Sequence, residues 1–409
     1  MPIIVQKYGG SSVADADKVK HVARRIAATR NRGHDVCVVV SAMGDTTDDL
    51  IRLARSVAAR PDPRELDLLL STGELVSCAL LAMALKDMGY KAVSLTGFQA
   101  GIATDTTFGK ARILKVDPRR IRAGLEEGRV VIVAGFQGFT PEMDVTTLGR
   151  GGSDTTAVAV AAALGAARCE IYTDVEGIYT ADPRVVPEAR KLKEISYEEM
   201  LELANYGAKM HPRSIELGAV YRVPIYVAST FSEAPGTLIH GEVTMEQTME
   251  GRKKVTGVAY DLNVARITLV GVPDRPGIAA ALFEPLAEEG ISVDTIVQNV
   301  GESQATDLSF TVARTDLPRA VEIVRPVATH LGARDVRTDD RLAKVSIVGA
   351  GMQNAPGYAS RMFRALADAG INIEMITTSE IRITCLVRDE QAREAVRVLH
   401  RAFELEKEE

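Results

Sequence analysis

The feature that most constrains the fold is a series of short, nearly continuous apolar segments in the first 245 residues, separated by amphipathic stretches. The apolar segments lie at 3–8, 35–43, 92–97, 130–136, 169–173 and 223–229, and the amphipathic stretches include 15–32, 66–89 and 195–206. Apolar strands that alternate with helices are typical of a mostly parallel sheet covered on both faces. The sequence therefore predicts an α/β fold, with an open, mostly parallel sheet between helices.

The remainder of the chain contains an internal repeat. Residues 276–296 align without gaps to residues 356–376, with nine of 21 positions identical. Each copy follows a strand-like segment, 265–272 or 343–350, and runs through a helix into two further strands and another helix. This order predicts two ferredoxin-like (βαββαβ) units.

The periodic pattern fades between residues 230 and 252, where Pro, Gly and mixed charges accumulate. Such composition is typical of a domain boundary. We therefore expect a first domain at 1–245, a linker and first strand of the second region at 246–262, and the two repeat units at 263–340 and 341–409.

Charge and cysteine usage exclude several classes of protein. A net charge of −6 provides no basic field for nucleic acid or anionic lipid. The four cysteines are scattered, which argues against a disulfide framework or a zinc site and fits a reducing cytoplasm. We see neither a signal peptide nor an apolar run of membrane-spanning length, so we expect a cytoplasmic protein with no membrane or nucleic-acid partner.

Residues 344–355 resemble the start of a dinucleotide-binding fingerprint, because a strand leads into Gly-x-Gly. The third glycine position holds Asn354, however, and only about 60 residues follow, too few for a dinucleotide-binding domain. An NAD site is therefore not predicted.

Two strand ends in the first domain carry candidate phosphate-binding turns. After Lys7, Gly9 and Gly10 let the backbone approach a ligand, and Ser11 leads toward a helix N-terminus that can hold an anion. Ser41 and Thr47 follow the next strand in the same way, and Glu74 lies beside a small-residue break in a helical stretch. Taken alone, an ordinary strand-to-helix turn, with Glu74 as a solvated or capping residue, is the simpler explanation of these residues.

The segment 150–166 places a polar cluster before an almost purely apolar helix. The apolar helix must be buried, so the cluster lies at the edge of the sheet, where ligands bind in open α/β folds. Arg150 suits a carboxylate and Asp154 an ammonium, so the two could hold a zwitterionic amino acid, with Ser153 or Asp154 also capping the helix. A capped buried helix with a surface ion pair explains the same residues equally well.

A third group of candidates follows the strand at 169–173. Thr173 and Asp174 lie at the strand end, and Tyr179 and Arg184 lie in the polar loop beyond it. Two lysines, Lys7 and Lys209, and an arginine could together surround a triphosphate. His211 has no partner at metal-ligand spacing, so we interpret it as structural.

The motifs KYGGSS, VVVSAMGDTTD, TGE, AGFQGF, TTLGRGGSDTTA, YTDVEGIYTADPR and HPRS occur in this order. Together they closely resemble the aspartate kinases of the amino-acid kinase superfamily, and the repeat resembles their paired ACT regulatory domains. The resemblance implies a carbamate kinase-like sheet and phosphorylation of the L-aspartate side chain by ATP with Mg²⁺. It also implies the first step toward lysine, threonine and methionine.

The resemblance also implies roles for individual residues. The catalytic residues would be Lys7, Arg150 and Asp154. The aspartate site would comprise Thr47, Glu74, Arg150, Gly151, Gly152, Ser153 and Asp154. The ATP site would comprise Lys7, Tyr8, Gly9, Gly10, Ser11, Ser41, Thr173, Asp174, Tyr179, Arg184, Lys209 and Met210. The segment between Lys209 and HPR is one residue shorter than in relatives, and no protein ligand for a metal is assigned.

The repeat is expected to bind effector amino acids at the loops that lead into its helices. Asp274 in the first copy suits an effector ammonium, whereas the second copy has Asn354, so the first unit should bind lysine or threonine more strongly. The expected effector residues are Asp274, Pro276, Gly277, Ile278, Ala279, Gln298, Asn299, Asn354 and Asn372. We also expect a homo-oligomer formed through the ACT units, with an internal start near Met245 or Met249 as a source of a separate regulatory subunit.

Two other functions remain open at this point. One is a kinase of the same fold that acts on glutamate or N-acetylglutamate. The other is a non-catalytic amino-acid sensor with an inert kinase fold. The sequence does not say which amino acid inhibits or how many copies assemble.

Overall fold

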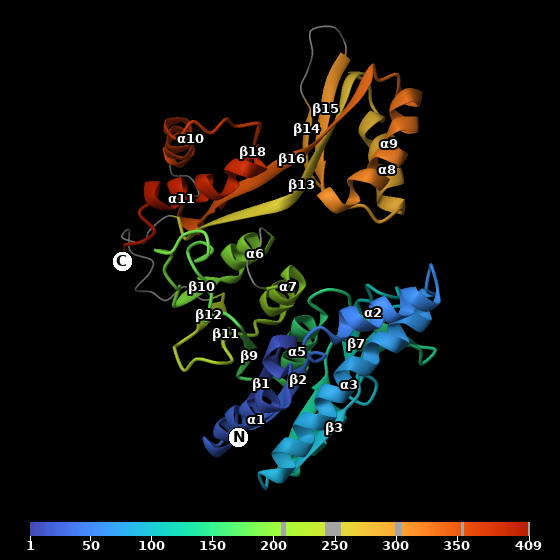
Figure 1. The fold of residues 1–409 in the computed structure, drawn as a ribbon, viewed down its shortest axis with the longest axis vertical. Helices are drawn as coiled ribbons and strands as arrows, with labels where there is room; N and C mark the ends of the chain where they lie inside the picture. Colours follow the sequence, from blue (N-terminus) through green and yellow to red (C-terminus); the bar gives the residue numbers. More distant parts are fainter. Residues whose placement is uncertain (206–209, 242–254, 299–304, 353–355, 408–409) are drawn as a thin grey trace. The chain divides into compact units, whose positions relative to one another are not determined.

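The computed structural model describes residues 1–205, 210–241, 255–298, 305–352 and 356–407 (Figure 1). The chain divides into two compact units. The first unit comprises Met1–Tyr179 and Lys191–Gly251, and the second comprises Thr180–Arg190 and Arg252–Glu409.

The first unit is built on an eight-stranded sheet with the order β10-β12-β11-β9-β1-β2-β6-β3. Its strands are β1 (Ile3–Tyr8), β2 (Asp35–Val40), β3 (Ala92–Leu95), β6 (Val130–Ala134), β9 (Arg168–Thr173), β10 (Glu194–Ser196), β11 (Ile225–Ser229) and β12 (Thr237–His240). All neighbours are parallel except β11 and β12. The predicted open, mostly parallel sheet is confirmed, because the apolar runs fill its buried centre.

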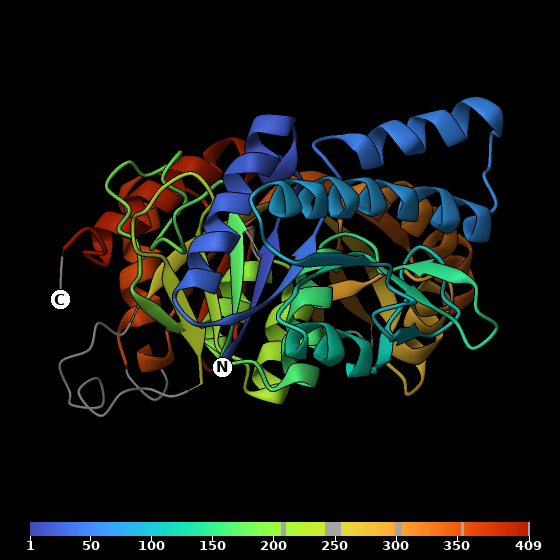
Figure 2. The ribbon, with the colours of Figure 1, turned by 90° about the horizontal axis from the view of Figure 1, so that it is seen from below.

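Helices cover both faces of this sheet. They are α1 (Ala16–Asn31), α2 (Thr46–Val57), α3 (Pro63–Asp87), α4 (Arg119–Glu126), α5 (Gly152–Leu164), α6 (Tyr197–Asn205) and α7 (Pro212–Tyr221). Helices α1 and α3 pack against each other on one face, and α4 and α5 lie on the other (Figure 2). A small second sheet has the order β5-β4-β7-β8, formed by β4 (Ile102–Thr104), β5 (Ile113–Val116), β7 (Gln137–Phe139) and β8 (Val145–Thr147).

Helix α3 is long and apolar enough to cross a membrane, and it is the one such helix among the described residues. Half of its most apolar stretch is buried inside the protein. Its Asp67 is 1% exposed and accepts hydrogen bonds from the backbone of Gly109 (2.8 Å) and from both the backbone and hydroxyl of Thr147 (2.7 Å each). These contacts identify α3 as a core helix of the first unit.

The second unit contains a six-stranded antiparallel sheet with the order β14-β15-β13-β16-β18-β17. Its elements are β13 (Gly257–Pro273), α8 (Ile278–Glu288), β14 (Val293–Gln298), β15 (Ala305–Val312), α9 (Leu317–Leu331), β16 (Asp335–Val348), α10 (Tyr358–Asp368), β17 (Met375–Thr378), β18 (Arg382–Arg388) and α11 (Ala392–Ala402). The two predicted ferredoxin-like units are present. In the second repeat, the strand that follows the helix α10 is β17, and it begins only at Met375.

Strands β13 and β16 run through both repeats. Residues 264–270 of β13 pair with 335–342 of β16 in the first repeat, and residues 257–261 pair with 344–348 in the second. The strand that precedes the first repeat in the sequence therefore completes the sheet of the second repeat. Each repeat has its own apolar core beneath its two helices.

Candidate active site

A cavity of about 270 Å³ lies in the first unit at the carboxyl ends of β1 and β2 and the start of α5. It is lined by Lys7, Gly10, Ser41, Ala42, Gly44, Thr47, Glu74, Phe136, Gly149, Arg150, Gly151, Gly152, Ser153 and Asp154. Ten of these residues belong to the sets expected for aspartate and ATP. The structure therefore brings together candidates from four separate motifs of the sequence.

A buried ion pair lies at the base of this cavity. The Nζ atom of Lys7, near the end of β1, is 2.6 Å from a carboxylate oxygen of Asp154 in the first turn of α5. Both residues are 9% exposed. The sequence left Asp154 available for a substrate ammonium, but here its charge is balanced by Lys7. Asp154 and Lys7 are therefore held against each other in the lining of the cavity.

The start of α5 differs from the expected capped helix. The N-cap is Gly151, which has φ +71° and makes no side-chain cap, so the expectation that Ser153 or Asp154 caps α5 is wrong. A Cβ atom at Gly151 would lie 2.4 Å from the side chain of His211. Only glycine fits here.

His211 itself has a structural role, as its isolated position in the sequence suggested. Its Nδ1 atom accepts a hydrogen bond from the backbone of Arg213 (3.3 Å) and caps α7. Burial lowers its pKa, which favours the neutral ring that can accept this bond.

The turn after β1 is also arranged differently from the expectation. A short 3₁₀ turn at Gly10–Val13 follows the strand, and α1 begins later, capped by the Asp15 carboxylate. A Cβ atom at Gly10 would lie 2.8 Å from the carbonyl oxygen of Ala42, so the loops after β1 and β2 touch. The backbone of Gly44 donates to the carbonyl of Gly10 (3.1 Å) and joins these loops into one wall of the cavity.

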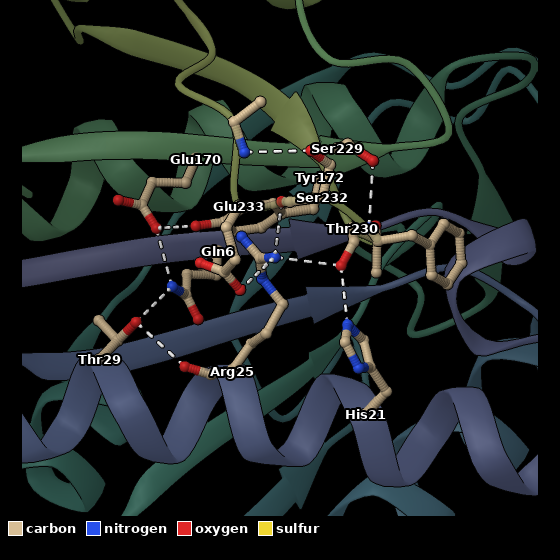
Figure 3. A network of polar contacts seen from close by, with 12 residues as sticks. Gln6, His21, Arg25, Thr29, Glu170, Tyr172, Ser229, Thr230, Ser232 and Glu233 are labelled. Atoms are coloured by element: carbon tan, nitrogen blue, oxygen red, sulfur yellow. Dashed lines mark hydrogen bonds and ion pairs between the residues drawn. The ribbon is translucent and has the colours of Figure 1, made fainter.

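A polar network fixes the loop after β11 to α1 (Figure 3). Arg25 stacks over the ring of Tyr172, 4.6 Å from its centroid, and donates to the carbonyls of Thr230 (3.1 Å) and Ser232 (3.2 Å). The His21 ring lies 2.9 Å from the Thr230 carbonyl. The network therefore supports the ends of β9 and β11. Two further candidates, Thr173 and Asp174, lie at the end of β9.

Tyr8 belongs to this network and does not line the cavity. Its side chain is fully buried, stacks on Tyr172 with centroids 5.0 Å apart, and donates to Gln6 (3.3 Å). Gln6 in turn donates to Glu170 (2.8 Å). Tyr8 thus supports β1 and β9 from within the fold.

Glu74 presents an incompletely bonded carboxylate to the cavity. It is 2% exposed, and one oxygen accepts from the backbone of Ala42 (3.1 Å). Its other oxygen has no hydrogen-bond partner among the described residues. Burial raises the pKa of Glu74 to about 7. A buried carboxylate of this kind gains its missing partner from a cationic ligand such as an ammonium.

The other ATP candidates do not line this cavity. Thr173 ends β9 and donates to Asp174 (3.0 Å), and Tyr179 forms an isolated bridge with Lys191. Arg184 lies in the second unit, paired with Asp182 at 2.7 Å. Gly9 and Ser11 adjoin Gly10, Met210 is 4% exposed, and Lys209 lies outside the described residues.

Five of the effector candidates lie at or just before the start of α8 in the first repeat. Gly277 is the N-cap with φ +93°, Asp274, Pro276 and Ala279 are exposed, and Ile278 is buried. Gln298 is exposed at the end of β14, and Asn372 donates to Glu374 (3.4 Å). Asn299 and Asn354 lie outside the described residues. A cavity of about 270 Å³ adjoins Gly357, the N-cap of α10, in the second repeat.

Phe136 is the cavity residue that sequence reasoning missed most clearly. It adopts φ +67°, unusual for a residue with a side chain, and its backbone donates to the hydroxyl of Thr156 (3.2 Å). Its ring would be 2.9 Å from a Cβ atom at Gly152. The AGFQGF motif marks the place, but nothing in its letters indicates the left-handed backbone.

The described residues contain no group of three or more His, Cys, Asp or Glu side chains that could hold a metal ion. The one carboxylate at the base of the cavity, Asp154, is already paired with Lys7.

Comparison with known proteins agrees with this geometry. The amino acid kinase family model matches residues 2–229, and ACT domain models match residues 266–328 and 345–403. The chain is 52% identical to an aspartokinase of Mycolicibacterium smegmatis, covering 99% of this chain and 97% of the relative. It is also 52% identical to an aspartokinase of Thermus thermophilus, with full coverage of both.

Solved structures give the same result. E. coli aspartokinase III in complex with aspartate and ADP superimposes with a TM-score of 0.82 at 28% identity, covering 98% of this chain and 99% of the other. The chain belongs to the amino acid kinase family. Within this family, its full-length similarity groups it with the aspartokinases.

Proposed function

We propose that this chain transfers the γ-phosphoryl group of ATP to the side-chain carboxylate of L-aspartate, giving ADP and 4-phospho-L-aspartate. The observation that carries this proposal is the buried Lys7–Asp154 pair in a small cavity that also contains Arg150 and Glu74. The E. coli relative was solved with aspartate and ADP, which supports the same substrates here.

The reaction needs no general base, because a side-chain carboxylate is already ionised at neutral pH. Catalysis then depends on positioning and on neutralising charge around the transferred group. Lys7 supplies that positive charge, and the Asp154 carboxylate holds the Lys7 ammonium in place. Arg150 pairs with the α-carboxylate of the substrate aspartate, and Glu74 pairs with its α-ammonium group. Mg²⁺, which offsets phosphate charge, would arrive with the nucleotide.

The remaining candidates complete the nucleotide and substrate sites. Gly9, Gly10 and Ser11 would present backbone groups to the phosphates, and Ser41, Thr47 and Ser153 would supply hydroxyls. Thr173, Asp174, Tyr179, Arg184, Lys209 and Met210 would hold the rest of the nucleotide.

The direct test is ADP release from ATP in a coupled assay with aspartate, glutamate and N-acetylglutamate offered in turn. We expect turnover with aspartate alone. Turnover with one of the other acids instead would identify a different kinase of this family. No turnover with any acid, together with binding of free amino acids, would favour the sensor.

The ionisation of Glu74 should give kcat/KM for aspartate a distinct pH dependence. Because its pKa is raised to about 7, the carboxylate is ionised above that pH and neutral below it. Only the ionised form pairs with an ammonium, so kcat/KM for aspartate should fall by up to about tenfold per pH unit below about pH 7. The measurement is a pH profile of kcat/KM for each substrate at saturation with the other.

Glu74→Gln is the matched control, since its amide oxygen can still accept from Ala42. We expect kcat/KM for aspartate at about pH 8 to drop roughly 10- to 100-fold, with the dependence below pH 7 lost. A wild-type profile retained in Glu74→Gln would remove Glu74 from the substrate site.

We further propose that the ACT units sense end products of the pathway. Lysine and threonine are the candidate effectors, and methionine shares the same biosynthetic entry step; E. coli aspartokinase III was solved with lysine and aspartate in its T-state. The exposed edge strands β14 and β17 can pair between chains, which supports a homo-oligomer. A cytoplasmic enzyme with no nucleic-acid or membrane partner fits the net charge of −6. The internal starts at Met245 and Met249 lie outside the described residues and remain a proposal.

Asp274→Ala tests the effector site. Asp274 is exposed beside the N-terminus of α8, where it can pair with an effector ammonium while backbone N–H groups hold the carboxylate. We expect uninhibited turnover near that of the wild type and loss of inhibition by lysine or threonine, with half-inhibition shifted about tenfold or more. The measurement is titration of each amino acid, singly and together. Equal inhibition of the variant would place the effector elsewhere.

A further inference from the structure

Thr230, which directly follows β11, bonds to three other segments of the first unit and is fully buried. Its backbone N–H donates to the carbonyl of Thr173 at the end of β9 (2.8 Å). Its hydroxyl lies 2.6 Å from that of Ser12 in the 3₁₀ turn after β1. Its carbonyl faces α1. One residue therefore connects the ends of β9 and β11 to the turn after β1.

Two side chains of α1 point at the carbonyl of Thr230 (Figure 3). Nε2 of His21 lies 2.9 Å from this oxygen, and Arg25 donates to it at 3.1 Å. The His21 ring also stacks on Phe231, with centroids 6.0 Å apart, and Arg25 donates to the next carbonyl but one, that of Ser232 (3.2 Å). Helix α1 and strand β9 therefore fix the position of Thr230 independently of its contact with Ser12.

The turn after β1 is held from two sides. Gly9 and Gly10 have wide conformational freedom, so their backbone needs contacts from elsewhere to keep one conformation. On one side, the backbone of Gly44 in the loop after β2 donates to the carbonyl of Gly10 (3.1 Å). On the other side, the fully buried Ser12 contacts Thr230 through its hydroxyl. Because buried hydroxyls require hydrogen-bond partners, this second contact contributes to the conformation of the turn.

We infer that Ser12 and Thr230 are positioning residues for the phosphates of the nucleotide. The inference rests on the proposed function, which gives the backbone of Gly9 and Gly10 to these phosphates. Gly10 lines the cavity, and a Cβ atom at Gly9 would lie 3.5 Å from Nζ of Lys7, so the turn runs beside this lysine. Backbone donors that are already held in place lose less freedom when a ligand binds. The two hydroxyls therefore strengthen nucleotide binding without contacting the nucleotide.

The test is Thr230→Val, which keeps the shape of the side chain and the backbone bonds but removes the hydroxyl. We expect KM for ATP to rise about three- to tenfold while KM for aspartate changes by less than about twofold. Thr230→Ser retains a hydroxyl and should restore KM for ATP. Ser12→Ala removes the other partner of the same contact, so it should raise KM for ATP similarly.

The double variant Ser12→Ala/Thr230→Val separates positioning from stability. Each single variant leaves one buried hydroxyl without the other, so each should lower the thermal midpoint. The double variant leaves neither hydroxyl behind, and its midpoint should return toward that of the wild type. Its KM for ATP should stay raised, with little rise beyond the single variants, because the contact is still absent. A KM for ATP that recovered together with the midpoint would mean that the single variants act only through stability.

Thr104→Val is the matched control in the same unit. The hydroxyls of Thr104 and Thr146 lie 2.6 Å apart in the small second sheet, and both residues are fully buried. Neither is among the residues that line the cavity. Thr104→Val should lower the thermal midpoint about as much as Thr230→Val without changing KM for ATP. An equal rise in KM for ATP in both variants, or no rise in Thr230→Val and Ser12→Ala, would overturn the inference.

Titration of ADP into each variant measures nucleotide affinity without any acid substrate, and so separates this inference from the proposed function. We expect the Kd for ADP to rise about three- to tenfold in Thr230→Val and Ser12→Ala. The same rise in a chain whose wild type phosphorylates a different acid would reject the proposed substrate and keep the positioning role. Normal ADP binding in both variants, with aspartate turnover in the wild type, would reject only the positioning role. A wild type that binds no ADP would overturn both.

Discussion

Replacing Lys7 by alanine should lower kcat by about 10²-fold or more, because the transferred phosphoryl group loses its buried positive partner. The KM for aspartate should change much less, since Arg150 and Glu74 remain in the cavity. Steady-state rates of ADP release, measured with each substrate varied in turn, give both constants. A folded Lys7→Ala enzyme with near-normal turnover would contradict the assignment.

Lys7→Ala should also be less stable than the wild type. The position of Lys7 at a strand end suggests little effect on folding, but its removal leaves Asp154 buried without its partner. An unpaired buried group costs about 1–3 kcal/mol, and more when it is charged. The double variant Lys7→Ala/Asp154→Asn should recover much of this loss in denaturant unfolding yet stay inactive, which separates chemistry from folding.

Asp154→Asn should lower kcat by about 10- to 100-fold, because Lys7 loses the carboxylate that orients its ammonium. If Asp154 instead bound the substrate ammonium, KM for aspartate would rise with kcat little changed. The split between kcat and KM for aspartate therefore distinguishes the two roles. Substrate titrations at a fixed, saturating ATP concentration provide the measurement.

Asp67→Asn is the control for this variant. Asp67 is another buried acid of the first unit, but it bonds to Gly109 and Thr147 and does not line the cavity. Its replacement should reduce the free energy of unfolding without a comparable fall in kcat. Equal losses of kcat in Asp67→Asn and Asp154→Asn would mean that both act only through stability.

Much of the fold could be predicted because local patterns determine it. Val36–Val40 and Val130–Ala134 read as buried strands since they contain no polar residue, and they form the neighbouring, fully buried strands β2 and β6. The sharing of β13 between repeats and the packing of Val185 and Val186 with the second unit could not be predicted. Both depend on contacts between segments far apart in the sequence, which no local periodicity records.

The candidate site shows the same division. Glycines at 9, 10, 151 and 152 marked the loops, since close backbone approach leaves a clear signal in composition. The pairing of Lys7 with Asp154 leaves no such signal in the sequence, because either residue alone is an ordinary polar side chain beside a turn. Its geometry exists only once β1 and α5 are assembled.

The passage of β13 through both repeats makes the second repeat a circular permutant of the first. In the first repeat the fourth strand, part of β16, follows the helix α9, whereas in the second repeat the equivalent strand, residues 257–261, precedes all its other elements. The first repeat is thus an insertion within the second. No single cut of the chain between β13 and β16 yields two complete units, because the second repeat has strands on both sides of the first in the sequence. Both Met245 and Met249 precede Gly257, so a chain begun at either would contain every strand of the six-stranded sheet but not Val185 and Val186, which complete the core of the second repeat.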